Sequence, residues 1–390
     1  MEVKYLKLID ICEKIVDCPH ESPSWLNEGV PVIRNFNLVN GRIDFSNGYY
    51  VDEKTYLKRI KRAIPQEGDI VFSREAPIGN CAIIPKDFKC CLGQRLVLLR
   101  VKKEICSPEY LLAALMSEPV KKQIRGVNNS GSIVSNYDIG DLKELLIPIV
   151  KEQDYIASVS GLANSKIINN DNISNELEKM CLINFDRLFV DYGTVSVDDI
   201  EYNEALGRNA PKKWKVVKLG SILKESKKSK IQVSGAKQEG QFPFFTSGEG
   251  IIRFDEFFVD GFNLYLNTGG NPGVKGFLGK AAYSTDTWCI SAGEYTYYLY
   301  YYFQKIYNQM ETLFFAGSGL KHLQKDAFKS QYIVLPPEEL LTEFNIIAEL
   351  YFQNFSKSLE ENLLMQRLSD FIVPYTMSGV ISYLPSNIES

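Results

Sequence analysis

A chain of 390 residues, of which 45% are hydrophobic, is long enough for two domains and apolar enough to build their cores. It contains no run of 18 apolar residues and no basic-then-apolar leader pattern, so we expect neither a transmembrane helix nor a signal peptide. The eight cysteines form no CxxC pair and only two histidines occur, which argues against a zinc site and favours reduced thiols in a cytoplasmic protein.

The net charge of −4 is unevenly distributed along the chain. Residues 1–150 and 207–336 carry net charges of +2 and +7, whereas residues 151–206 and 337–390 carry −7 and −6. Because a basic face is a local property, an acidic chain of this kind remains compatible with nucleic-acid binding. The alternative, that long helices only carry glutamate on solvated faces, does not account for the lysines of residues 207–336.

Short apolar strands alternate with short helices in residues 1–150, as is typical of an α+β domain. The pattern predicts strands at 31–36, 69–74, 81–84 and 91–100, a tight turn at Asn47-Gly48 and a helix over 52–62. A further helix is expected after Ser107, which suits an N-cap and is followed by Pro108 at the first helical position.

Ile147-Pro148 ends this domain and opens a long segment, residues 151–192, in which apolar residues recur at close to helical spacing. We expect a first long helix over these residues, opened by Pro148, because proline stops a strand and suits a helix start. At ~1.5 Å per residue this helix would be roughly 58 Å long. Residues 193–210 are predicted to be a polar linker.

Residues 211–336 repeat the element order of residues 1–150. Segment 263–273 corresponds to 69–79, segment 288–291 to the region of Cys91, and Leu335-Pro336 to Ile147-Pro148. Residues 337–373 are then predicted to form a second long helix of roughly 52 Å, with a C-terminal tail over 374–390. We interpret the chain as an internal duplication in which the two long helices pair antiparallel as a coiled coil.

Known catalytic motifs are missing from the sequence. There is no GxxxxGK[ST] phosphate loop, no Asn-Pro-Pro-aromatic signature of amino-methyltransferases and no clustered nuclease carboxylates, and segment 269–273 is interpreted as a glycine-rich turn. The tyrosine-rich segment 295–303 could stack on bases, but its place in the repeat favours a packed helix. We therefore expect a non-catalytic protein that needs no metal ion or cofactor.

Polar and basic side chains do occur on predicted turns at matching positions of the two halves. Arginine pairs with guanine and asparagine with adenine at major-groove edges, while lysine, serine and threonine suit phosphates. Any one of these residues could be an ordinary solvated loop residue, but the matching positions predict a DNA-contacting surface in each half. The candidates are Arg34, Asn35, Arg74, Asn80, Arg95, Arg125, Asn128, Asn129 and Ser132, and then Lys227, Lys228, Lys230, Arg253, Asn267, Thr268, Asn271, Lys275, Lys280, Lys321 and His322.

Over essentially all of its residues, the chain resembles the specificity (S) subunits of type I restriction-modification systems. Pro211-x-x-Trp214-x-x-x-x-Leu219 is similar to the family's opening of a recognition domain, and Pro148-x-x-x-Glu152-Gln153-x-x-Ile156 to the entry of its first spacer helix. Gly131-Ser132 and Gly317-Ser318 also resemble the family. The second helix departs from the pattern, since it has Glu338-Glu339 where Glu-Gln is expected, and the first half lacks the tryptophan of the opening motif.

This resemblance implies an α+β fold with two α/β target-recognition domains, 1–150 and 211–336, joined by two long antiparallel helices in a pseudo-twofold internal duplication. Each domain would read one half of a bipartite site in double-stranded DNA, and the helices would set the spacing and dock two methyltransferase subunits. Restriction motor-nuclease subunits could join, and no membrane is involved. Because the halves differ in residues and charge, we expect an asymmetric site. The alternative is a coiled-coil scaffold with two protein- or carbohydrate-binding domains that does not bind DNA.

Overall fold

The computed structural model describes residues 3–378 except 46–47, 76, 128–135, 238–239, 249, 318 and 320. The chain divides into two compact units, of which unit 1 contains residues 1–169 and 361–390 and unit 2 contains residues 170–360. Each long helix crosses this division, so each unit contains part of both helices. Within the described residues, no helix is both long and apolar enough to cross a bilayer.

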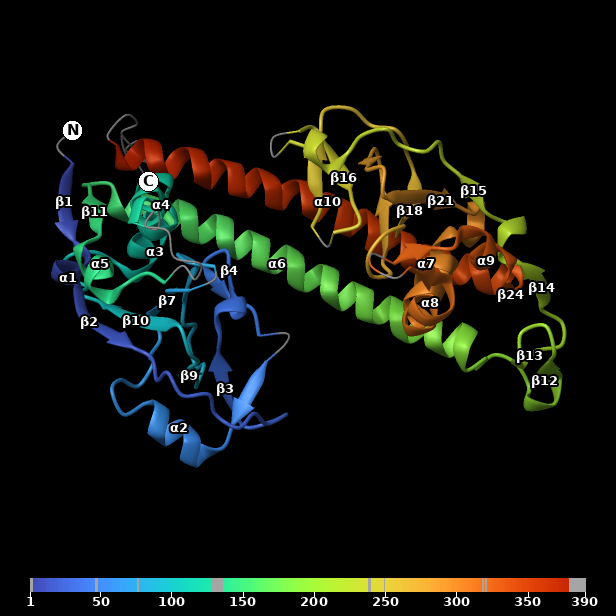
Figure 1. Ribbon diagram of the computed structural model, residues 1–390, viewed down its shortest axis with the longest axis horizontal. Coiled ribbons are helices and arrows are strands. Elements are labelled where there is room, and N and C mark those ends of the chain that lie inside the picture. Colours follow the sequence, from blue (N-terminus) through green and yellow to red (C-terminus); the bar gives the residue numbers. More distant parts are fainter. Residues whose placement is uncertain are drawn as a thin grey trace, which may run out of the picture. The chain divides into compact units, whose positions relative to one another are not determined.

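Unit 1 is built on a four-stranded antiparallel sheet, and a second, three-stranded sheet mixes parallel and antiparallel pairing (Figure 1). The four-stranded sheet has the order β2 (Cys12–Asp17), β10 (Leu96–Val101), β7 (Ile70–Ser73) and β8 (Cys81–Ile83). In the other sheet β3 (Val30–Ile33) pairs antiparallel with β6 (Tyr49–Val51) and parallel with β9 (Cys91–Leu92). Two separate antiparallel pairs are β1 (Lys4–Lys7) with β11 (Leu146–Ile149) and β4 (Leu38–Val39) with β5 (Arg42–Ile43).

The short α-helices in the described residues of unit 1 are α1 (Leu8–Ile11), α2 (Glu53–Arg59), α3 (Pro108–Met116), α4 (Glu118–Val127) and α5 (Ile139–Glu144). The predicted cap of α3 is confirmed, because the Ser107 hydroxyl accepts a hydrogen bond of 3.1 Å from the Tyr110 amide. Tyr110 and Leu111 are fully buried and pack in one core cluster with Phe72 and Leu99 of the four-stranded sheet. Burial against this sheet therefore holds α3 in place.

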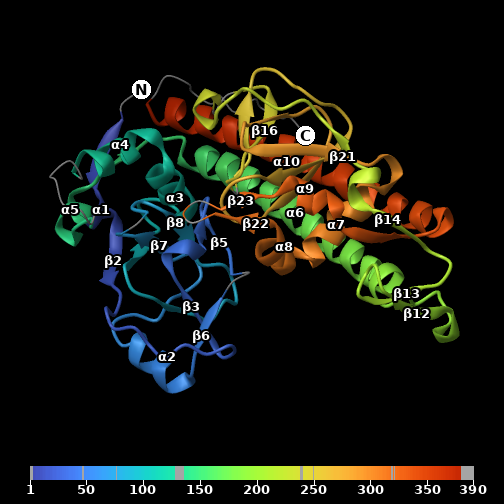
Figure 2. The ribbon, with the colours of Figure 1, turned by 45° about the vertical axis from the view of Figure 1, so that its right-hand side comes forward.

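Unit 2 repeats the strand pairing of the four-stranded sheet, the three-stranded sheet and the β1–β11 pair of unit 1, and several of its elements are labelled in Figure 2. Its four-stranded sheet has the order β15 (Lys224–Glu225), β21 (Thr287–Ser291), β18 (Phe262–Asn267) and β19 (Val274–Leu278). β16 (Phe242–Phe245) pairs antiparallel with β17 (Ile252–Phe254) and parallel with β20 (Ala282–Tyr283). β14 (Lys215–Lys218) pairs with β24 (Tyr332–Leu335), as β1 does with β11, and the helices are α7 (Thr296–Lys305), α8 (Tyr307–Phe314) and α9 (Lys325–Ser330). The predicted internal duplication is thus confirmed at the level of strand pairing.

Unit 2 also contains two strand pairs outside this common order. β22 (Phe315–Ala316) pairs with β23 (His322–Leu323). β12 (Ile200–Asn203) pairs with β13 (Arg208–Pro211), so the segment predicted to be a polar linker contains an antiparallel hairpin.

A tyrosine hydroxyl makes the same contact in both units. The Tyr110 hydroxyl donates to the carbonyl of Pro148 over 2.6 Å, and the Tyr298 hydroxyl donates to the carbonyl of Val334 over 2.8 Å. Strand register makes these two carbonyls equivalent, because Pro148 faces Tyr5 and Val334 faces Val216 at corresponding places of the two strand pairs. We call this hydrogen bond the tyrosine clasp. It fastens the first helix after the sheet to the strand that leads into a long helix.

Pro148 is therefore not the start of a helix. It lies inside β11, its equivalent in unit 2 is Val334, and the equivalent of Pro336 is Val150. The first long helix, α6, spans Gln153–Phe185 and continues as a π-helical turn over Asp186–Val190. The second, α10, spans Glu338–Met377 and continues through Pro374, so the predicted tail begins inside this helix.

The two long helices run antiparallel within each unit. In unit 2 the contacts of α6 with α10 include a hydrogen bond of 3.2 Å from Ser174 to Asn354 and the rings of Phe185 and Phe344, whose centroids lie 5.7 Å apart. Residue numbers therefore rise along one helix as they fall along the other. In unit 1 the Lys166 ammonium lies 2.9 Å from the carboxylate of Glu361.

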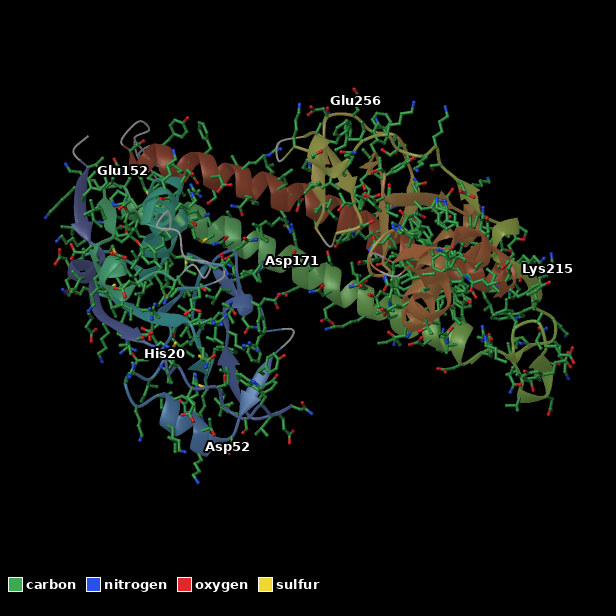
Figure 3. The ribbon with its side chains drawn as sticks, viewed as in Figure 1. His20, Asp52, Glu152, Asp171, Lys215 and Glu256 are labelled. Carbon is green, nitrogen blue, oxygen red and sulfur yellow. The ribbon has the colours of Figure 1, made fainter. Side chains whose placement is uncertain are left out.

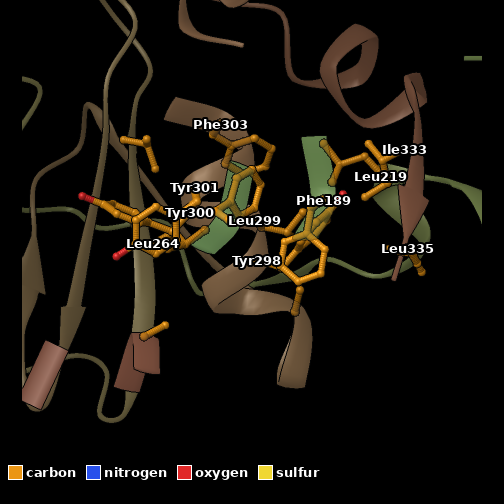
Figure 4. Close-up of a cluster of buried hydrophobic side chains, with 14 of the residues drawn as sticks. Phe189, Leu219, Leu264, Tyr298, Leu299, Tyr300, Tyr301, Phe303, Ile333 and Leu335 are labelled. Carbon is orange, nitrogen blue, oxygen red and sulfur yellow. The ribbon is translucent and has the colours of Figure 1, made fainter. Parts of the chain in front are cut away.

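Aromatic side chains dominate the core of unit 2. Figure 4 shows Tyr298, Leu299, Tyr301 and Phe303 of α7 inside this core, where each is at most 1% exposed. The tyrosine-rich segment is thus a packed helix, as predicted, and not a base-stacking surface. Burial raises the pKa of the Tyr298 and Tyr301 hydroxyls well above that of a free tyrosine, which keeps both neutral in the core.

The strand expected over 91–100 is interrupted. Cys91–Leu92 belongs to the three-stranded sheet and Leu96–Val101 to the four-stranded sheet. Between them the chain turns at Arg95, whose φ of 70° lies in the left-handed region. Because of this turn, the apolar segment 91–100 contributes a strand to each of the two sheets.

Candidate nucleic-acid interface

Three segments meet at one end of the four-stranded sheet in each unit. In unit 1 the Arg74 amide donates to the carbonyl of Arg95 at 2.9 Å, and the Tyr137 amide donates to the carbonyl of Arg74 at 2.8 Å. These bonds join three segments, namely the one after β7 at Arg74, the turn before β10 at Arg95 and the residues before α5 at Tyr137. We call these three segments together the loop edge.

The loop edge of unit 2 has the same backbone. The Thr268 amide donates to the carbonyl of Asp286 at 3.0 Å, and the Leu323 amide donates to that of Thr268 at 3.1 Å. The segments follow β18, precede β21 and precede α9. Isolated bridges agree with the match, since Glu75 pairs with Asn136 in unit 1 as Gly269 pairs with His322 in unit 2. One scaffold therefore carries two different sets of side chains.

Arg74 is a structural residue of this edge. It is 7% exposed, and its guanidinium donates to the carbonyl of Tyr137 at 2.9 Å and to Asn136 at 3.3 Å, and pairs with the carboxylate of Asp17 at 3.0 Å. Such burial and pairing do not support the prediction that Arg74 contacts DNA. Its role is to hold the segments after β2, after β7 and before α5 together.

Arg95 and Arg34 remain accessible at the loop edge of unit 1. The Arg95 side chain is 52% exposed and pairs with Glu75 at 2.9 Å. Arg34 follows β3, and its guanidinium carbon lies 4.9 Å from the ring centroids of Phe36 and Tyr49 and 5.2 Å from that of Trp25. The sequence contained these aromatic residues near Arg34, but only the fold shows that they surround it.

The remaining candidates of unit 1 lie in different surroundings. The Asn80 side chain donates to the carbonyl of Leu38 at 3.3 Å, and Asn35 lies in a 3-10 turn over Asn35–Asn37. Arg125 is on α4, where it pairs with Glu118. Asn128, Asn129 and Ser132 lie outside the described residues.

Histidine is found beside the loop edge in both units. His20, labelled in Figure 3, follows β2 and its Nε2 lies 2.9 Å from the carboxylate of Asp17, which also pairs with Arg74. His322 has its Nδ1 3.3 Å from the carbonyl of Thr268. Both histidines are exposed, and His322 contacts Thr268 directly, whereas His20 is linked to Arg74 only through Asp17.

Several unit 2 candidates are engaged with their own backbone. The Asn267 side chain is buried and donates to the carbonyl of Asn271 at 3.1 Å, and Arg253 donates to the carbonyl of Gly240 at 3.0 Å. The Lys275 ammonium donates to the carbonyl of Thr246 at 2.7 Å. These three side chains shape turns, so their predicted contact with DNA is not supported by their geometry.

Other unit 2 candidates are exposed. Asn271, Lys321 and His322 lie at the surface of the loop edge, where Lys321 pairs with Glu311 at 3.1 Å. Lys280 is elsewhere, with its ammonium 4.8 Å from the ring centroid of Phe257. Thr268 at the edge is half-buried.

Lys227, Lys228 and Lys230 line a hollow of about 720 Å³ in unit 2, together with Phe258 and Tyr283. In unit 1 the equivalent of Tyr283 is Leu92, whose carbonyl accepts from the guanidinium of Arg59 on α2 at 2.8 Å. A helix therefore covers in unit 1 a place that is open and lined with lysines in unit 2. This difference matches the more basic charge of residues 207–336.

The carboxylate of Glu225 neutralises part of the positive charge near this hollow. Burial would raise the pKa of Glu225, but hydrogen bonds from Lys329 at 3.0 Å and from the Trp288 indole at 2.8 Å outweigh it and lower that pKa. Lys325 lies with its ammonium 4.7 Å from the Trp288 ring centroid, and burial lowers its pKa. Lys227, Lys228 and Lys230 of the hollow are exposed and form no ion pair within the described residues, unlike Lys329.

Within the part of the chain that the structure describes, no three histidine, cysteine, aspartate or glutamate side chains are grouped as a metal site would require. The geometry at the loop edges is instead that of donors and acceptors held at the end of a rigid sheet, in two versions. Such an arrangement can bind a polar surface by hydrogen bonds and charge.

Comparison with known proteins agrees with this geometry. The family described as the type I restriction modification DNA specificity domain matches the chain twice, at residues 1–179 and 211–363. The MjaIX specificity subunit of a type I restriction enzyme from Methanocaldococcus jannaschii is 22% identical over 354 residues, which is 84% of this chain and 81% of that protein. The EcoDI specificity subunit from Escherichia coli is 33% identical over 70 residues, 18% of this chain and 16% of that protein.

A solved structure shares the fold. The S subunit of a type I restriction-modification system from M. genitalium has a TM-score of 0.59 and 17% sequence identity to this chain, with 96% of this chain and 95% of that chain covered. The repeated sheets and loop edges, and a family match that covers both halves, lead to one conclusion: the chain belongs to the family of type I restriction modification DNA specificity domains.

Proposed function

We propose that this chain is the non-catalytic DNA-recognition subunit of a type I restriction-modification complex in the cytoplasm, and that each unit reads one half of a bipartite, asymmetric site. The observation that carries the proposal is the loop edge, which is built twice on one backbone plan with different side chains. Arg95 corresponds to Asp286 and Asn136 to His322. Different donors and acceptors at equivalent places favour different base sequences.

Two groups of candidates support contact with DNA in different ways. Arg34, Arg95, Asn271 and His322 are polar side chains at or beside the loop edges, where base edges could be read. The lysines of the hollow, Lys227, Lys228 and Lys230, suit phosphates, because an ammonium is a flexible point charge.

Exposed apolar side chains on the long helices support the docking of methyltransferase subunits. On the unit 1 part of α10, four large side chains recur at helical spacing and are 41–53% exposed, namely Leu364, Leu368, Phe371 and Tyr375. On the unit 2 part of the helices, Met180, Ile183, Ile346 and Leu350 are 53–68% exposed. An organised apolar stripe of this kind marks a protein interface more often than a solvated face. We propose one methyltransferase subunit at each of the two stripes.

The length of the helices supports their proposed role as a spacer. α6 has 33 residues and α10 has 40, which correspond to roughly 50 and 60 Å at ~1.5 Å per residue. Each exceeds the ~34–36 Å of one DNA turn, so half-sites separated by more than a turn suit these helices.

Co-expression with the methyltransferase subunit, followed by sequencing of methylated adenine in the host DNA, tests the proposal. We expect one bipartite sequence whose halves differ and are separated by an unspecified spacer. A single contiguous palindrome, or methylation without sequence preference, would contradict it. The family match leaves the scaffold alternative without support of its own.

A further inference from the structure

Arg34 is held rigidly by an exposed aromatic cluster. Its guanidinium carbon is 4.9–5.2 Å from the centroids of three rings, and the rings touch one another, with Trp25 and Tyr49 5.1 Å apart and Phe36 and Tyr49 6.0 Å apart. Trp25, Phe36 and Tyr49 are 37–44% exposed. Cation–π contacts with several rings fix the plane of a guanidinium and cover its faces.

Among the residues that the structure describes, no carboxylate pairs with this arginine. Within the described ranges, Arg34 forms no ion pair and its side chain donates no hydrogen bond. Other arginines of unit 1 are paired, for example Arg74 with Asp17 at 3.0 Å and Arg95 with Glu75 at 2.9 Å. An arginine carries five N–H donors, and in the described part of the chain those of Arg34 lie among three rings without a protein acceptor. That combination is expected of a group kept for an external acceptor.

The position of Arg34 is next to the loop edge. The Gly93 amide donates to the carbonyl of Ile33 at 2.7 Å, and a Cβ at Gly93 would lie 3.1 Å from Cγ of Arg34. The Arg34 side chain therefore passes directly over the turn that carries Arg95. A ligand that reaches Arg95 is within reach of Arg34 as well.

We propose that Arg34 reads a guanine in the half-site bound by unit 1, as a preformed two-donor fork aimed at O6 and N7. The inference rests on the proposed function and assigns a base to one residue of its site. Arginine bound to these two atoms is the commonest specific contact in the major groove. A guanine edge and a phosphate can each accept two parallel hydrogen bonds from a guanidinium, and the place of Arg34 over the turn that carries Arg95, at the loop edge, is what favours the base edge.

Unit 2 lacks this reader. Parallel pairing of β3 with β9 and of β16 with β20 makes Ile33 equivalent to Phe245, so Thr246 takes the place of Arg34. The Thr246 hydroxyl accepts from the Gly248 amide at 3.1 Å. The guanine contact belongs to one half-site only.

Trp25, Phe36 and Tyr49 act as positioning residues in this proposal. They touch the guanidinium rather than the base. Removal of one ring leaves the N–H donors of Arg34 in place but holds the guanidinium less firmly. The selectivity for guanine should therefore fall, while the affinity for non-specific DNA stays the same.

The test uses the complex of the full chain with its methyltransferase subunits and a library of duplexes in which the mapped site is randomised. Arg34→Ala should lower discrimination at one G·C pair by roughly 5- to 150-fold and leave the other half-site unchanged. Tyr49→Leu should give a smaller loss at the same pair. Replacing that guanine by 7-deazaguanine, which lacks N7, should weaken binding by the unaltered complex but not by Arg34→Ala.

Lys89→Ala is the matched control, since Lys89 also lies over a ring, that of Tyr56 at 4.6 Å, but pairs with Glu53 at 2.9 Å. It should leave the base preference unchanged. If Arg34→Ala does not fold, Arg34→Lys keeps the charge and the stem and should still lose the guanine preference.

Two results would overturn the inference. A uniform loss over all sequences, with the salt dependence of binding reduced by about one charge, would make Arg34 a phosphate contact. An unchanged base preference would remove Arg34 from the readout. Both results leave the unaltered complex specific for DNA, whereas failure of the proposed function would abolish specificity in the unaltered complex itself.

Discussion

Removing the hydroxyl of Tyr298 should loosen one strand pair of unit 2 and nothing in unit 1. Tyr298 is 1% exposed and its hydroxyl donates to the carbonyl of Val334 over 2.8 Å. Tyr298→Phe keeps the ring in the core, so the change is limited to the tyrosine clasp. A hydrogen bond of this kind contributes about 0.5–1.5 kcal/mol, and a buried acceptor left without its donor costs about 1–3 kcal/mol. We expect a loss of about 1–2 kcal/mol.

Amide hydrogen exchange of the full chain, read by mass spectrometry on peptides, measures this loss locally. A cost of about 1–2 kcal/mol corresponds to roughly 5- to 30-fold faster exchange. Peptides covering β14 and β24 should show it, while β1 and β11 stay unchanged. Tyr110→Phe should give the mirror image, with faster exchange in β1 and β11 alone.

Tyr332→Phe is the control within the same strand. Tyr332 is 42% exposed, so loss of its hydroxyl should change exchange by less than about 0.5 kcal/mol. If Tyr298→Phe left β24 unchanged, or if it loosened both units equally, the clasp would not be the local fastening that its geometry indicates.

Three further changes have defined outcomes. Arg100→Ala should lower the free energy of unfolding of unit 1 by about 3 kcal/mol in urea titrations, because it leaves the 3% exposed carboxylate of Asp69 without the partner 2.7 Å away. Burial raises the pKa of the Cys81 thiol to about 12. The buried neutral thiol therefore contributes its full stabilisation below about pH 8.5, the pKa of the thiol in the unfolded chain, and this stabilisation is lost as the pH rises towards 12. Between pH 7.5 and 10 the unaltered chain should lose about 1–2 kcal/mol more than Cys81→Ala in denaturant titrations, and equal losses would contradict this. Phe371→Glu should reduce co-purification of the methyltransferase subunit at least tenfold, whereas Leu57→Glu, at a 56% exposed leucine of α2, should not.

Much of the fold followed from local sequence patterns. The duplication, the cap at Ser107 and the burial of segment 295–303 are confirmed because turn residues, proline and apolar periodicity act over short distances. The role of Pro148 was predicted wrongly, since this residue lies inside β11, although α6 begins at Gln153, close to the predicted residue 151. Proline both opens helices and occupies strands that need no amide hydrogen, and only strand register distinguishes the two uses at Pro148.

The candidate site was harder to predict, because exposure depends on distant partners. Arg74 follows a strand, as an accessible loop residue would, yet Asp17 and Tyr137, far away in sequence, enclose it. Arg34 shows the reverse case. Nothing adjacent to it in the sequence indicates that Trp25 and Tyr49 come together around it. Packing between residues far apart in the sequence decides the surroundings of both arginines, and the spacing of residues along the chain does not reveal it.

The tyrosine clasp also bears on how two copies of one ancestral segment could diverge. Because the hydroxyl donates to a main-chain oxygen, the bond does not depend on the side chain at the acceptor position, which is proline in one unit and valine in the other. Selection need only have kept the tyrosine and the strand register. An alignment of the two halves that matched proline to proline would therefore be displaced by two positions. The same hydrogen bond thus joins equivalent places of the two units although the residues at the acceptor position differ.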